Sequence, residues 1–124
     1  MSASIPPQFQ EQLAKLQQLQ QTLQVVLNQK QQLELELSDS ERAFSELEKL
    51  TDDSIIYKSI GSLLVKADRP GIMKELSERK ELLKTRVNVL VKQEERTRVK
   101  LNELSQSIQE RLKQSPESTS TPSE

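Results

Sequence analysis

Cysteine and histidine are both absent from this chain of 124 residues. Without cysteine it has no disulfide, no thiolate metal site and no thiol nucleophile. Without histidine it lacks the commonest general base and the commonest metal ligand. Its only glycines are Gly61 and Gly71, so it has no glycine-rich phosphate loop. We therefore expect neither an enzyme nor a protein with a bound cofactor or metal.

Aromatic residues are also scarce, with two Phe, one Tyr and no Trp, while 30% of the residues are charged. This composition is poor for a globular core and typical of coiled coils and long helices. Low aromatic content with many Gln and Glu is also seen in disordered chains. The spacing of the apolar residues decides between the two, and it favours helices.

No excess of one charge is present, because 18 basic residues stand against 19 acidic ones. Such a balance gives no general attraction to nucleic acids or anionic membranes. Residues 1–7 lack the basic and apolar regions of a signal peptide. No apolar run approaches the ~18 residues of a membrane span. We expect a soluble cytoplasmic protein that binds neither membranes nor nucleic acids.

A first helix is predicted over residues 7–50, since Pro6 and Pro7 suit a helix start and residues 8–50 contain neither Gly nor Pro. Its apolar residues are Phe9, Leu13, Leu16, Leu19, Leu23, Val26, Leu33, Leu37, Phe44 and Leu47. From Leu19 onward the steps of four and three form a heptad seam, with Lys30 and Ser40 filling two gaps. The irregular step from Leu13 to Leu16 to Leu19 predicts a register break of the stammer type.

A second helix is predicted over residues 70–113, with Asp68 as its cap and Pro70 in its first turn. Its seam comprises Met73, Leu76, Lys80, Leu83, Val87, Leu90, Glu94, Thr97, Leu101, Leu104 and Ile108. Pro116 ends the pattern. Residues 114–124, rich in Ser, Thr and Pro, are predicted to be a disordered tail after one domain spanning 1–113.

The two helices are expected to pair antiparallel about Gly61. Leu47 then meets Leu76, Leu33 meets Leu90, and Leu16 meets Ile108. Leu37 likewise meets Val87, and Leu23 meets Leu101. Residues 1–50 carry a net charge of -3 and residues 70–113 a net charge of +4, so the flanks are complementary.

Between the helices, residues 55–67 have the composition of two short strands. Gly61-Ser62 suits a two-residue type II′ turn, which places Ile60 opposite Leu63. The resulting hairpin is apolar on both faces, with Ile56, Ile60, Leu63, Val65 and Ala67 on one and Ile55, Tyr57 and Leu64 on the other. An isolated hairpin is marginal in water and its edges invite association. We expect hairpins of several subunits to form one closed sheet; the alternative is a loop that only bends the chain.

A long helix, one apolar hairpin and a returning helix resemble prefoldin, in particular the β-type subunits of the archaeal complex. The segments that carry the resemblance are Pro7 to Leu13, Gln29 to Glu34, Tyr57 to Lys66 and Lys92 to Glu95. The hairpin is the most specific of them, and having only one separates the chain from α-type subunits, which have two. The likeness extends over residues 5 to 113.

The resemblance implies a mainly α-helical coiled-coil subunit in a hexamer of two α and four β chains. The hairpin residues Ile56, Tyr57, Ile60, Gly61, Leu63, Leu64 and Val65 would then form an intersubunit β-barrel. The family is an ATP-independent chaperone that captures unfolded proteins at the coiled-coil tips and passes them to a group II chaperonin. A structural coiled-coil tether or spacer is the alternative function, and it leaves the hairpin without a purpose.

Client proteins are expected to bind where both helices end. The predicted client-binding residues are Ile5, Phe9, Leu13 and Leu112. We expect exposure above all for Ile5, Phe9 and Leu112, because little apolar surface lies beyond them. Leu16, Leu104 and Ile108, by contrast, are expected to complete the core.

The same antiparallel register puts Lys30 and Glu94 in one seam layer, where opposite charges would fix the alignment; the alternative is that both side chains reach out to solvent. If they pair, Lys30→Glu and Glu94→Lys each lower the free energy of unfolding, and the double reversal restores part of it. A double-mutant cycle from urea unfolding measures this coupling, and a coupling energy near zero would refute the pair.

Overall fold

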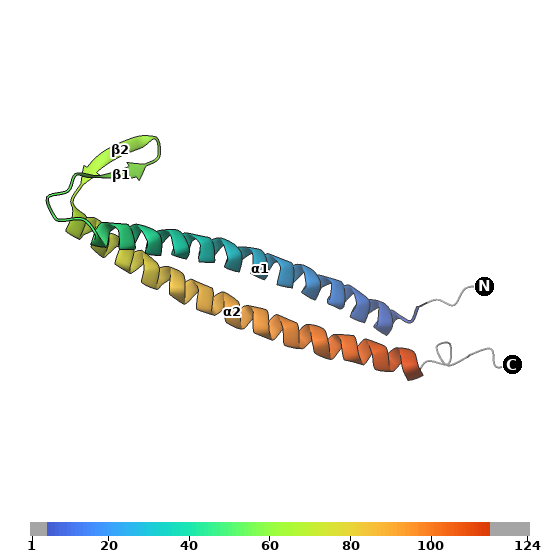
Figure 1. The fold of residues 1–124 in the computed structure, drawn as a ribbon. Coiled ribbons are helices and arrows are strands. Elements are labelled where there is room, and N and C mark those ends of the chain that lie inside the picture. Colours follow the sequence, from blue (N-terminus) through green and yellow to red (C-terminus); the bar gives the residue numbers. More distant parts are fainter. Residues whose placement is uncertain (1–4, 115–124) are drawn as a thin grey trace. The chain divides into compact units, whose positions relative to one another are not determined.

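The computed structural model describes residues 5–114 and contains two helices and two strands. In chain order they are α1 (Pro7–Glu48), β1 (Ile56–Ile60), β2 (Leu63–Ala67) and α2 (Arg69–Gln114) (Figure 1). The predicted fold class is confirmed, and α1 ends two residues before the predicted position 50. The predicted disordered tail lies outside the described residues from 115 onward.

Two compact units divide the chain. The terminal unit contains residues up to Asn28 and from Val91 onward, and the hairpin unit contains Gln29–Leu90. Each unit holds one segment of α1 and one of α2, which run in opposite directions (Figure 1). Over residues 5–114, neither helix has a stretch that is both long and apolar enough to cross a membrane.

In the terminal unit the inward positions of α1 follow an unbroken heptad pattern. They are Phe9, Gln12, Leu16, Leu19, Leu23 and Val26, all partly or fully buried. The predicted register break is therefore wrong: Gln12 takes the inward position, and Leu13 is 37% exposed. A stammer would require local overwinding of the helix. Burying the single side chain of Leu13 does not offset the cost of that distortion, so the helix keeps its regular geometry. On α2, Thr97 and Ile108 are buried as the predicted seam requires.

In the hairpin unit the seam positions are occupied as predicted. Leu83, Leu90 and the small Ser40 are buried there. Lys80 also holds an inward position, and its Nζ lies 4.4 Å from the centroid of the Phe44 ring. This cation–π contact lets a charged residue stand at the seam, because its stem packs while the ammonium group meets the ring face.

The β-hairpin has the predicted register. Ile60 pairs with Leu63, Lys58 with Val65, and Ile56 with Ala67. Gly61 has a φ of +59°, and no non-glycine residue has a positive φ among those described. A positive φ at the first turn position alone is what type II′ requires, which explains glycine at position 61.

Asp68 caps α2 as predicted. Its Oδ2 accepts a hydrogen bond of 2.8 Å from the backbone N–H of Gly71, which satisfies one of the donors that a helix start leaves unpaired. Pro70 follows in the first turn, where its missing N–H is not needed. The cap fixes where the chain turns from β2 into α2.

Arg69 joins the start of α2 to the end of α1. Its Nε donates a hydrogen bond of 2.6 Å to the carbonyl oxygen of Leu47, in the last turn of α1. Its NH1 forms an ion pair of 2.9 Å with Asp52 in the connecting loop. A cation at a helix C-terminus satisfies an unpaired carbonyl and opposes the helix dipole. Arg69 thus holds the two helix ends together beneath the hairpin.

Replacing Arg69 with Ala should lower the free energy of unfolding by roughly 1.5 kcal/mol, as expected for a hydrogen bond to a charged donor. Lys49→Ala, which removes only an exposed ion pair with Glu46, is the matched control and should change it by less than about 0.5 kcal/mol. Urea unfolding followed by circular dichroism measures both. Equal stability of the two variants would show that Arg69 does not hold the helix ends.

Candidate functional site

The hairpin presents apolar side chains on both faces. Five of the six predicted oligomerisation residues that have a side chain are exposed, with Leu64 at 71%: Tyr57, Ile60, Leu63, Leu64 and Val65. Ile55, just before β1, is also exposed. Within residues 5–114 the sheet has only these two strands, so each has one edge without a neighbouring strand. The chain thus displays apolar surface together with unpaired backbone groups.

The base of the hairpin, by contrast, packs on the helices of its own unit. Ile56 and Ala67 are partly buried, and Lys58 Nζ forms an ion pair of 2.7 Å with Glu75 of α2. An open cleft of about 620 Å³ lies between β1 and the helices. Leu47 and Leu76, predicted to meet, both line it. One face is therefore partly covered near its base, which the sequence did not predict.

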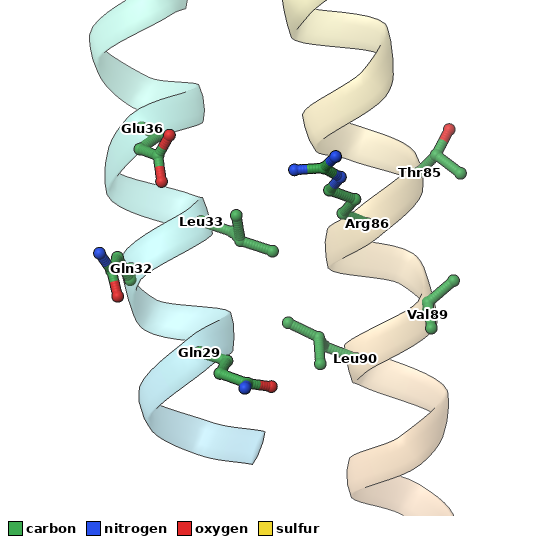
Figure 2. A pocket seen from close by; sticks show the side chains of 8 residues that line it. All are labelled: Gln29, Gln32, Leu33, Glu36, Thr85, Arg86, Val89 and Leu90. Atoms are coloured by element: carbon green, nitrogen blue, oxygen red, sulfur yellow. The ribbon is translucent and has the colours of Figure 1, made fainter. Parts of the chain in front are cut away.

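A second cleft, of about 490 Å³, lies between the two helical segments of the hairpin unit. Figure 2 shows Leu33 of α1 and Leu90 of α2 directed into it from opposite sides, as the predicted pairing requires. Arg86 extends from α2 toward α1 in the same view (Figure 2). The remaining lining is Gln29, Gln32, Glu36, Thr85 and Val89. The cleft thus has a small apolar floor with a polar rim.

The helix ends in the terminal unit expose three of the four predicted client-binding residues. Ile5 and Leu112 are each 46% exposed, and Leu13 is exposed as well. Phe9 is partly buried, so the expectation of an exposed Phe9 is wrong: its position lies in the unbroken heptad. Ile108 is buried, as expected.

A shallow cleft of about 480 Å³ lies on α1 at the exposed Leu13. Its apolar lining is Leu13, Ala14 and Leu16, and glutamines surround it at positions 10, 17 and 20. Apolar side chains ringed by uncharged polar ones can hold an apolar segment while staying hydrated when empty.

The sequence reading missed Gln12. Its Nε2 donates a hydrogen bond of 3.2 Å to Ser107 Oγ on α2. Its Oε1 is buried and accepts no hydrogen bond from any described residue. Counting the heptad back from Leu16 would have found it, because position 12, not 13, lies four residues before 16.

Lys30 and Glu94 are both partly buried. Glu94 accepts a hydrogen bond of 2.9 Å from Arg98 Nε, one turn further along α2, a neighbour that the sequence reading did not assign. Their predicted pairing with each other stays a prediction. Among residues 5–114, no three acidic residues are grouped so that they could hold a metal ion.

Comparison with known proteins identifies a family to which the chain is similar. A family model described as "Prefoldin subunit" matches residues 10–115. A prefoldin subunit beta from Methanothrix thermoacetophila is 44% identical over 116 residues, covering 94% of this chain and 97% of that protein. One from Pyrococcus furiosus is 44% identical over 110 residues, covering 89% and 94%. The crystal structure of the prefoldin beta subunit from Thermococcus strain KS-1 is similar with a TM-score of 0.79 at 42% identity, covering 88% of this chain and 96% of that one.

Proposed function

The chain belongs to the prefoldin subunit family of chaperones, and on that premise we propose that it is the β-type subunit of a hexamer of two α and four β chains. The hexamer captures unfolded proteins at the helix ends and passes them to a group II chaperonin without using ATP. The main support for this proposal is the hairpin, which exposes apolar side chains on both faces. In a single chain this exposure is unfavourable, and contact with other subunits would remove it.

Assembly through the hairpin follows from its energetics. Two strands alone bury too little apolar surface to be stable in water. The ion pair between Lys58 and Glu75 and the partial burial of Ile56 hold its base, but Leu63 and Leu64 stay exposed. Hairpins from other subunits would cover these side chains and pair both strand edges. A closed barrel leaves no edge for uncontrolled association.

Client capture at the helix ends follows from what assembly leaves exposed. Among residues 5–114, the exposed large apolar residues nearest the N-terminal end of α1 and the C-terminal end of α2 are Ile5, Leu13 and Leu112. Weak contacts of this kind repeated on several subunits hold a client by avidity. Both glycines have structural roles, since Gly61 forms the hairpin turn and the backbone N–H of Gly71 donates to the capping Asp68.

Co-expression with a prefoldin α-type subunit, followed by native mass measurement, tests the assembly. The proposal predicts one complex with two α and four β chains. If this chain stays alone in the presence of such a partner, the proposed assembly is wrong.

Introducing charge beside the turn should abolish assembly. In Ile60→Asp combined with Leu63→Asp, two buried carboxylates would replace contacts worth roughly 1.5–3 kcal/mol per side chain. The complex should be lost on size exclusion while helix content is kept. Leu35→Asp with Leu82→Asp is the matched control, since both leucines are exposed on helices of the same unit. A hairpin variant that keeps its mass would contradict the role of these residues.

Removing exposed apolar side chains at the helix ends should weaken client capture. Leu13→Ser with Leu112→Ser should leave assembly and melting temperature nearly unchanged, because both side chains are exposed. Suppression of aggregation of an unfolded protein, followed by light scattering, should fall, most for small clients that reach few subunits.

The matched control for that experiment is Val25→Ser with Val99→Ser, which removes exposed apolar side chains of the same unit farther from the helix termini. It should protect clients as well as the unaltered protein. If both double variants lose protection equally, capture is not confined to the helix ends.

A further inference from the structure

Gln12 is a polar residue in an apolar row. The other inward positions of α1 in the described part of the terminal unit are Phe9, Leu16, Leu19, Leu23 and Val26. A leucine at position 12 would continue this row and close the seam between α1 and α2. The glutamine therefore weakens the pairing of the helices close to their ends.

The carboxamide of Gln12 is only half satisfied. Its bond to Ser107 Oγ is 3.2 Å long and exposed to solvent, so water competes with it. Its Oε1 is buried and has no hydrogen-bond donor within residues 5–114. A buried acceptor without a donor shifts the equilibrium toward an open arrangement by on the order of tenfold, because opening lets it bind water or another donor.

The polar residues around Gln12 also favour separation of α1 from α2 at this position. A cleft of about 360 Å³ there is lined by Gln8, Glu11, Gln12, Lys15 and Arg111. Across it, Arg111 NH1 donates to Gln8 Oε1 at 3.4 Å, a long and exposed bond. Two exchangeable polar contacts thus join α1 to α2 here, beside the partly buried Phe9 and the buried Ile108.

An unfolded polypeptide supplies what this site lacks. Its peptide groups carry an N–H donor and a carbonyl acceptor, either of which a carboxamide can bind. Its apolar side chains can pack on Phe9 and Ile108 once the helices separate. Folded proteins pair most of their backbone groups in helices and sheets, so this recognition favours unfolded chains without selecting a sequence.

We propose that Gln12 is a binding residue of the client site, where the helix ends part at the Gln12–Ser107 bond to admit an extended apolar segment. A backbone N–H of that segment donates to Gln12 Oε1, and its side chain packs between the helices. This inference rests on the proposed capture function and adds to it the place of opening and the group that is recognised.

The decisive variant is Gln12→Leu in the assembled complex, with a single-domain protein diluted from guanidinium as the client. Leucine completes the apolar row, so the melting temperature should rise and backbone amides of residues 8–13 should exchange more slowly. Because the end no longer opens, the complex concentration needed for half-maximal suppression of aggregation should increase by about tenfold. Gln21→Leu, on the exposed side of α1, is the control and should change neither property.

Ser107→Ala provides an independent second variant. It removes the bond that holds the closed end, so amides of residues 8–13 should exchange faster while client capture is maintained or strengthened. In the unaltered complex, client binding should slow exchange of the same amides.

The outcomes are distinguishable. If Gln12→Leu raises stability but captures clients as well as or better than the unaltered complex, Gln12 is only structural and the inference is wrong. If Ser107→Ala abolishes capture, opening at this bond is also refuted. If the unaltered complex captures no client, the proposed function itself fails, and this inference fails with it.

Discussion

Within each unit, a segment of α1 pairs with a segment of α2 through heptad positions, and the other features require this contact. The sequence has few aromatics, and the residues that are buried between positions 5 and 114 are seam positions of these antiparallel segments. The seam tolerates polar residues where a local contact satisfies them. Lys80 lies over the Phe44 ring, Thr97 donates to the carbonyl oxygen of Gln93, and Ser40 is small enough to be buried.

A pair of helices is too narrow to cover both faces of the hairpin, and this explains why much of the hairpin is exposed. Arg69 and Asp68 fix the two helix ends from which the hairpin emerges. The helices then reach Ile56 and Ala67 at its base but leave Leu63 and Leu64 exposed. The same geometry that gives each chain a regular fold therefore leaves surface that other subunits can cover. Near the N-terminal end of α1 and the C-terminal end of α2, Leu13 and Leu112 are exposed as well.

Elements with a strict period could be predicted from the sequence. The alternation of strand side chains together with Gly61-Ser62 leaves one hairpin register, and that register is observed. The seam of α2 followed in the same way from its steps of three and four. The failures arose where residue type was preferred to period: the spacing of Leu13, Leu16 and Leu19 was interpreted as a register break, although Gln12 continues the heptad, and Phe9 was expected to be exposed. The bond from Arg69 to the Leu47 carbonyl could not be predicted, because it depends on the path of the loop between the helices and the hairpin.

If hairpins assemble as proposed, the hairpin is exposed in the single chain and covered in the complex. Backbone hydrogen exchange of β1 and β2, measured for the chain alone and for its complex with an α-type subunit, tests it most directly. We expect rapid exchange of the hairpin amides in the chain alone and strong protection in the complex, with the middle of the helices changing little. Equal exchange of the hairpin amides in both states would contradict it.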